Sequence, residues 1–191
     1  MDTKEKILDV GRQLFASYGY EGTTMTMIAG GVEIKKPSLY AHYTSKEQIF
    51  KDVLDKEVAD YITFLHEAAA ADDSSIKEKL YRLLVEHALD DEASMNFYYR
   101  FIKYQPAGLE EYIVGSFAEM ESETEKIFEM ILNQGKEQGE IDKSLSNTQI
   151  YRMYFLLVDG LSTMPVSYKS EMDGRDYLGI WEVFYRGIEK R

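Results

Sequence analysis

The chain has 191 residues, 45% of them hydrophobic, with 15 tyrosines, no cysteine and a formal net charge of −12. The hydrophobic content supports a folded core and argues against disorder, and the absence of cysteine excludes disulfides and thiolate metal sites. No segment resembles a signal peptide, and no apolar run approaches the roughly 20 residues of a membrane span, so we expect a soluble cytoplasmic protein.

The excess negative charge lies entirely beyond residue 50. Residues 1–50 carry six basic and six acidic side chains, whereas residues 51–191 carry 16 basic and 28 acidic ones. DNA is a dense polyanion, so the second part should repel it while the first part tolerates it.

The first predicted element is an amphipathic helix from about residue 3 to residue 18. Its apolar residues recur at helical spacing. They are Ile7, Val10, Leu14, Phe15 and Tyr18. Gly19 follows as a helix stop.

Two short helices are predicted next, within about residues 24–43. Thr24 can cap a helix from Met25 to about Gly31. Pro37 opens the second helix, because proline has no N–H to leave unpaired in a first turn. This arrangement is a helix-turn-helix, whose second helix lies in the DNA major groove.

A long connecting helix over 46–70 is predicted to start after Ser45. Ser45 and Gln48 form a capping box, in which each side chain accepts from the other residue's backbone N–H. The helix is long enough to link the first part of the chain to the second.

The pattern of residues 15–50 has a counterpart in a known family. It is carried by Phe15, Tyr18, Gly19, Thr24, Ile28, Ala29, Lys36, Pro37, Ser38, Leu39, Tyr40, His42, Tyr43, Ser45, Lys46, Glu47, Ile49 and Phe50. These residues resemble the TetR-type (TetR/AcrR) transcriptional regulators, without a gap from Ile28 to Tyr40. The resemblance implies an all-α fold with a DNA-binding head, residues 1–50, and a helical effector-binding and dimerisation body, residues 51–191.

Two departures from the family pattern lie at the turn. The chain has Val32, Glu33 and Ile34 where the family has alanine, glycine and valine, and the helix before the turn ends in Gly30 and Gly31. A glutamate at positive φ costs about 1–2 kcal/mol, and each helical glycine costs roughly 1 kcal/mol. We therefore expect the turn to be distorted or shifted toward the glycines.

The resemblance implies two sets of DNA-binding residues. The recognition helix would present Lys35, Lys36, Pro37, Ser38, Tyr40 and His42. Thr24, Thr26, Tyr43 and Lys46 would fix it on the DNA backbone through phosphate contacts. Ser38 and Lys36 are the better candidates for base edges. The alternatives are a solvated charged face for the lysines and core packing for Tyr40.

The rest of the chain predicts five more helices. They cover about residues 76–88, 95–105, 109–138, 147–163 and 177–189. Ser94 would cap the second of them, and Pro165 would halt the fourth.

An effector pocket is expected in the body, mostly apolar as small-molecule sites usually are. Its candidate residues are Phe97, Tyr98, Phe101, Tyr104, Phe117, Met120, Phe155 and Asp159. Asp159 interrupts an apolar run, and a buried carboxylate needs a partner. The alternative is that these aromatic residues form the core.

A homodimer interface is expected from the last two helices. Its candidates are Gly160, Tyr177, Ile180, Trp181, Phe184 and Ile188, because such an apolar stripe would not be left in water. The alternative is that this stripe covers the chain's own core.

No catalytic constellation appears in the sequence. The three histidines are isolated, and neither metal-ligand spacing nor a nucleophile elbow nor a phosphate-binding glycine loop occurs. We expect no enzyme activity, cofactor, metal or membrane partner. The hypothesis is a homodimeric repressor that a small molecule releases from double-stranded operator DNA. The alternative is a helical small-molecule-binding dimer that does not act through DNA.

Overall fold

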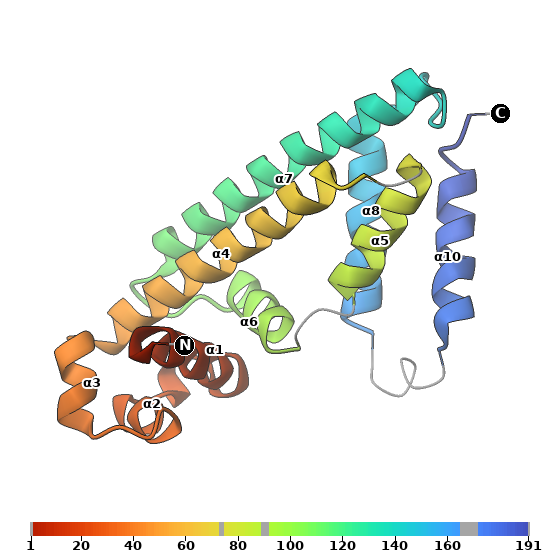
Figure 1. Cartoon of the computed structure of the whole chain (residues 1–191). Coiled ribbons are helices and arrows are strands. Elements are labelled where there is room, and N and C mark those ends of the chain that lie inside the picture. The colour runs from red at the N-terminus through yellow and green to blue at the C-terminus, as the bar shows by residue number, and fades with distance from the viewer. Residues whose placement is uncertain (1, 73–74, 89–91, 165–171, 191) are drawn as a thin grey trace. The chain divides into compact units, whose positions relative to one another are not determined.

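The computed structural model describes residues 2–72, 75–88, 92–164 and 172–190, and every regular element in these ranges is a helix (Figure 1). The helices are α1 Thr3–Gly22, α2 Met25–Gly31, α3 Lys36–His42, α4 Lys46–Ala70, α5 Ile76–Ala88, α6 Glu92–Lys103, α7 Glu110–Gln138, α8 Asn147–Ser162 and α10 Gly174–Arg186. The expected all-α class is confirmed.

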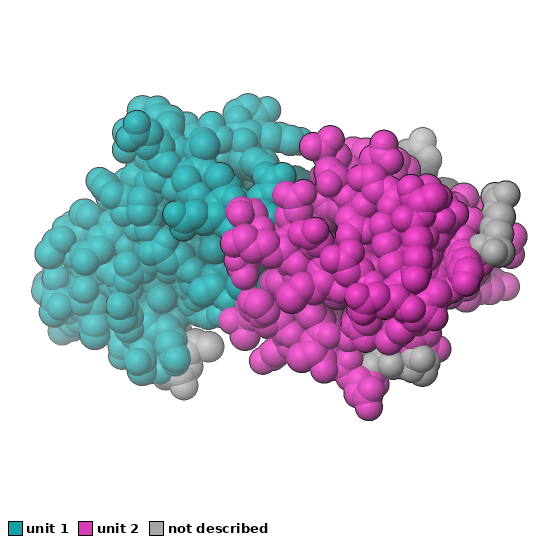
Figure 2. All heavy atoms as spheres, turned by 90° about the horizontal axis from the view of Figure 1, so that it is seen from above, with its two compact units in different colours: residues 1–62, 91–121 teal, residues 63–90, 122–191 magenta. Residues whose placement is uncertain are grey.

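The chain packs as two compact units (Figure 2). Unit 1 contains Met1–Ile62 and Asp91–Glu121, and unit 2 contains Thr63–Asp90 and Ser122–Arg191. Unit 1 therefore includes α6 and the first part of α7 as well as the N-terminal helices. The expected division at residue 50 is one of function and stays a prediction.

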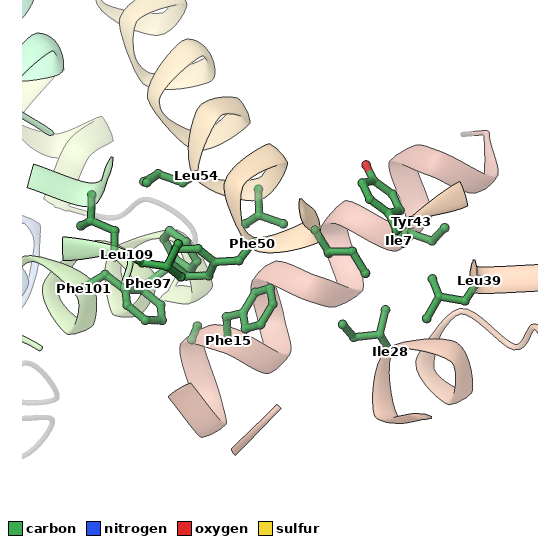
Figure 3. Packing of buried hydrophobic residues seen from close by; sticks show 14 of the residues in the cluster. Ile7, Phe15, Ile28, Leu39, Tyr43, Phe50, Leu54, Phe97, Phe101 and Leu109 are labelled. Atoms are coloured by element: carbon green, nitrogen blue, oxygen red, sulfur yellow. The ribbon is translucent and has the colours of Figure 1, made fainter. Parts of the chain in front are cut away.

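Aromatic rings fill the core of unit 1 (Figure 3). The Phe50 ring of α4 lies 5.2 Å from Phe15 of α1 and 4.8 Å from Phe101 of α6, both edge to face. Phe97 packs 4.8 Å from Phe101. Each such pair contributes about 0.5–1.5 kcal/mol beyond its buried area. Helix α6 is therefore part of the scaffold that supports α1 and α4.

Helix α1 breaks at the residue where a stop is expected, and one more turn follows. Gly19 has φ 73°, and the helical pattern resumes to Gly22. The Arg100 guanidinium of α6 donates to the carbonyls of Ala16 and Ser17 across 2.9 and 3.3 Å. These bonds satisfy carbonyls that the break leaves without helical partners.

The helix ends of unit 2 are held by charged side chains. Glu140 accepts from the backbone N–H of Ile76 across 3.0 Å at the start of α5. Lys79, which is 5% exposed, donates to the carbonyls of Ala69 and Ala71 at the end of α4. A carboxylate at a helix N-terminus and an ammonium at a C-terminus both complement the helix dipole.

Two helices begin earlier than the sequence pattern indicates. Helix α6 begins at Glu92, so Ser94 lies inside the helix and accepts from Arg12 Nη1 across 2.6 Å instead of capping it. Helix α10 begins at Gly174 behind a capping box made by Asp173 and Asp176. Pro165, which was expected to halt α8, lies outside the described residues.

Candidate nucleic-acid interface

The helices α2 and α3 form the expected helix-turn-helix within unit 1. Thr24 Oγ1 accepts from the N–H of Met27 across 3.2 Å and so caps α2. The turn is closed by Ile34, whose N–H donates to the carbonyl of Ala29 across 3.0 Å. Pro37 lies in the first turn of α3.

Glu33 takes the left-handed backbone position of the turn, with φ 61°, while Gly30 and Gly31 stay in α2. The expected shift toward the glycines is therefore wrong. Gly31 is needed for packing instead, because a Cβ at this residue would come within 2.6 Å of Val10 Cγ1 on α1. Glycine at residue 31 thus permits the close approach of α2 to α1.

Helix α3 turns one residue inward and the rest outward. Leu39 is fully buried, whereas Tyr40 is 45% exposed. The other exposed residues at and around this helix are Lys35, Lys36, Pro37, Ser38 and His42. Lys36 Nζ lies 6.0 Å from the centre of the Tyr40 ring. Tyr40 is thus not a core residue, and this face offers two ammonium groups and two hydroxyls.

Two threonines lie at the start of α2, Thr24 as its N-cap residue and Thr26 in its first turn. Thr24 and Thr26 are both exposed at the N-terminal end of α2. Threonine hydroxyls can donate to phosphate oxygens, contacts that set register without reading sequence. Their role in DNA binding stays a prediction.

Tyr43, which was expected to contact phosphate, is engaged within the protein. Its side chain is 1% exposed, and its hydroxyl donates to Asp52 Oδ2 of α4 across 2.9 Å. Burial and, after it, this hydrogen bond raise the pKa of Tyr43 above its usual value. Tyr43 is thus a buried donor behind the recognition helix, and its contact with DNA stays an untested prediction.

Lys46 is engaged within the protein. Its Nζ donates to the backbone carbonyl of Tyr20 across 2.6 Å and lies 4.1 Å from the centre of the Tyr20 ring. The bond ties the start of α4 to the end of α1. The ammonium group has two further protons, and its contact with phosphate stays a prediction.

Sequence reasoning missed Lys4. Its Nζ lies 3.2 Å from Asp52 Oδ2 and 5.6 Å from the centre of the Tyr43 ring. A single lysine in the first turn of an amphipathic helix gives no signal of such a contact in the sequence.

The residues proposed for the effector pocket divide between the two units. Phe97 and Phe101, each 1% exposed, belong to the core of unit 1, and their role as pocket walls stays a prediction. Tyr104 is 75% exposed and follows the end of α6. Tyr98 and Phe117 pack edge to face at 5.1 Å, and Met120 packs on the same core.

Phe155 and Asp159 lie on α8 in unit 2. Phe155 packs 5.1 Å from Phe128 and 4.8 Å from Tyr151. Asp159 is exposed, so the argument that its carboxylate is buried does not hold.

The apolar stripe of α10 is divided between core and surface. Trp181 and Ile188 are 1% and 7% exposed, and the Trp181 ring lies 5.8 Å from Tyr81 of α5. These two residues pack in the core of unit 2, and their place in a dimer interface stays a prediction. Tyr177, Ile180 and Phe184 are half-buried and stay predictions.

Exposed apolar residues remain on α8 and on α10, and we name them together the α8 and α10 surface. Leu156 and Met153 of α8 are 66% and 55% exposed, and Val183 of α10 is 77% exposed. A Cβ built on Gly160 or Gly179 would meet nothing within 4 Å. A partner helix could therefore approach either backbone closely.

Within the described ranges, no three His, Asp or Glu side chains are grouped so that they could hold a metal ion. In the same ranges no helix has the length and apolar character needed to cross a bilayer.

Comparison with known proteins agrees with this geometry. Residues 7–53 match the model of the family described as "Bacterial regulatory proteins, tetR family". The biofilm operon negative transcriptional regulator IcaR of Staphylococcus epidermidis is 38% identical over 96 residues, which cover 50% of this chain and 51% of that protein. The matched stretch thus spans about half the length of this curated relative.

Solved structures share the fold over nearly the whole chain. A putative transcriptional regulator from Saccharomonospora viridis in complex with choline has a TM-score of 0.78 at 16% identity, covering 98% of each chain. The transcriptional regulator FadR from Bacillus subtilis in complex with stearoyl-CoA has a TM-score of 0.69 at 19% identity, covering 95% of each chain.

Proposed function

We propose that this chain is a transcriptional regulator of the TetR family, and that it acts as a homodimeric repressor that a small molecule releases from operator DNA. The observation that carries the proposal is the exposed face of α3. Lys35, Lys36, Ser38 and Tyr40 are exposed there, while Leu39 anchors the helix to the core.

The chemistry of this face suits a nucleic acid duplex. Lys35 and Lys36 supply charge for phosphates, and the Ser38 hydroxyl can donate to or accept from a base edge. The net charge is −12, so the rest of the molecule should repel DNA and oppose non-specific binding. Binding would thus depend on this local surface, in the bacterial cytoplasm where the operator is.

Repression is favoured by the named relatives. IcaR proteins of two staphylococci, 37–38% identical to this chain over about half its length, are described as negative transcriptional regulators. A repressor blocks transcription by occupying its operator, which requires no activating contact elsewhere on the molecule.

Small-molecule control is favoured by proteins of the same fold. Two structural relatives were solved in complex with stearoyl-CoA and with choline. A compound of either kind would release DNA from this chain only if it bound the DNA-competent and the DNA-incompetent forms with different affinity. Candidate contacts from unit 1 are Tyr98, Phe117 and Met120.

Dimerisation is favoured by the exposed apolar surface of α8 and α10. Its members are Met153, Leu156, Gly160, Gly179 and Val183. Two-fold pairing through such a surface would give two recognition helices, which suit half-sites about one DNA turn or a little more apart.

The test is selection of binding sites from random duplex DNA with the purified protein. The expected result is a two-fold symmetric site, together with a steep fall in affinity as salt rises, because bound phosphates release counterions. A flat salt response with no selected site would overturn the proposal and favour a helical small-molecule-binding dimer that does not act through DNA.

Release is tested on the selected site. Acyl-CoA thioesters and quaternary ammonium compounds are titrated against the DNA complex, and anisotropy reports dissociation. Phe117→Ala should change the concentration needed for release, whereas Val114→Ala, an exposed residue of the same helix, should not. Equal release from both variants would place the effector elsewhere.

A further inference from the structure

The recognition helix α3 has few anchors of its own. It is seven residues long, it has no side-chain capping hydrogen bond at Lys35, and Leu39 is its one buried residue. Ile34, just before it, is partly buried against the same core. Apolar contacts are non-directional, so these two side chains hold α3 against the core but define its rotation only weakly.

A directional contact follows directly after α3. Tyr43 is its C-terminal cap residue, and its buried ring lies among the core side chains (Figure 3). The Tyr43 hydroxyl donates to Asp52 Oδ2 of α4 across 2.9 Å. Lys4 of α1 lies 3.2 Å from the same oxygen. These three residues, the Lys4–Tyr43–Asp52 cluster, connect α1, the end of α3 and α4 within unit 1.

On the basis of the proposed function, we propose that Asp52 is a positioning residue for sequence recognition. By accepting the hydrogen bond of Tyr43, it fixes the orientation of α3 and thus which base edge Ser38 reaches. Hydrogen bonds weaken steeply when their angle is wrong, so base readout depends on this orientation. Contacts from flexible lysine stems to phosphates depend on it much less.

The consequence is specific. Loss of the Tyr43–Asp52 bond should reduce the preference of the protein for its selected site over other DNA. Affinity for unrelated DNA should change little, because Lys35 and Lys36 remain exposed. A general loss of folding would instead lower both affinities together.

The chain contains a matched control for this bond. Tyr112 of α7 donates to Asp55 Oδ1, also on α4, across 2.5 Å, and Lys51 Nζ lies 5.0 Å from the Tyr112 ring. The tyrosine-to-aspartate hydrogen bond is of the same kind as that of Tyr43, although Tyr112 is less buried and Lys51 pairs with Glu47 rather than with Asp55. This second group, however, includes no residue of α3 or its cap.

The experiment compares Tyr43→Phe with Tyr112→Phe in the full chain. For each protein, dissociation constants are measured at one salt concentration for the selected duplex and for a scrambled duplex of the same length. Tyr43→Phe should lower the ratio of the two affinities roughly tenfold, as expected for a lost hydrogen bond to a charged group. Tyr112→Phe should leave the ratio unchanged.

Conservative substitutions separate positioning from general structure. Asp52→Asn keeps an acceptor oxygen and should retain the preference, whereas Asp52→Leu should lose it while its circular dichroism spectrum remains helical. Equal ratios for Tyr43→Phe and Tyr112→Phe would overturn the inference and leave the DNA-binding function intact. If the unmodified protein shows no preference for any duplex, the proposed function fails, and the inference fails with it.

Discussion

Lys36 and Tyr40 lie on the same exposed face of α3, but they would contribute to DNA binding through different physics. Lys36 carries a charge that can neutralise one phosphate, whereas the Tyr40 hydroxyl is neutral. Their removal should therefore be distinguishable by salt dependence.

We predict that Lys36→Ala lowers operator affinity and reduces the slope of log affinity against log salt by about 1. Tyr40→Ala should lower affinity by roughly tenfold, with the slope unchanged, through loss of a hydrogen bond to a charged phosphate. Both proteins should keep their helicity, because the Tyr40 side chain is 45% exposed. A Tyr40→Ala protein that lost helicity together with DNA binding would show that its role is structural.

Glu33 carries the backbone strain of the turn. We predict that Glu33→Gly raises the free energy of unfolding by about 1 kcal/mol, because glycine adopts positive φ without the steric cost that glutamate has there. Urea denaturation measures the change. Glu33→Ala is the matched control: it removes the carboxylate but keeps the strain, so an equal gain from Glu33→Ala would assign the effect to charge.

At the scale of the helices, the sequence predicts well which segments are helical, and it predicts less well the residue at which each helix begins. Helix α2 was predicted from Met25 to about Gly31, and its bounds are Met25–Gly31. Helices α6 and α10 begin earlier than predicted because their first residues, such as Glu92 and Arg175, are polar or small. Apolar periodicity carries no signal for such a turn.

The exposure of the candidate site residues was predictable only where the pattern of apolar and polar residues along a helix shows which face is exposed. Lys36, Ser38 and Tyr40 are exposed as expected. Tyr43 is buried against Asp52, and only the packing of α4 beside α3 decides this. Contacts between elements that are distant in the chain, such as Arg100 with Ala16, have no local signature.

Glu140 joins the start of α5 to the segment after α7. Its carboxylate accepts from the N–H groups of Ile76 and Lys77. We predict that Glu140→Ala lowers the free energy of unfolding by about 1–2 kcal/mol, since it removes a cap at a helix N-terminus. Glu140→Gln should lose roughly 0.5–1 kcal/mol, because it keeps an acceptor but not the charge.

Thermal and urea denaturation of both Glu140 variants would check this order. Glu137→Ala is a suitable control, since Glu137 is an exposed residue of the same helix end. If Glu140→Ala were no less stable than Glu137→Ala, the capping bonds would contribute nothing.

At the scale of the whole molecule, apolar periodicity alone does not decide which stripe faces the core and which faces a partner. The α10 stripe contains both kinds of residue: Trp181 is buried in unit 2, while Val183 is 77% exposed. Exposure in the single chain therefore selects the residues whose substitution tests dimerisation without disturbing the fold.

We predict that the double variant Leu156→Glu, Val183→Glu is a folded monomer with weakened operator binding. Two carboxylates on an apolar surface oppose its burial against a second copy. The chain itself would lose little stability, because both side chains are more than 60% exposed. Operator affinity should fall by about 100-fold or more, since two linked heads gain from effective concentration and single heads do not.

Light scattering gives the mass, and circular dichroism gives the helicity. Val114→Glu, at an exposed position of unit 1, controls for added negative charge and should remain dimeric. A double variant that stayed dimeric would remove the α8 and α10 surface from the dimer interface.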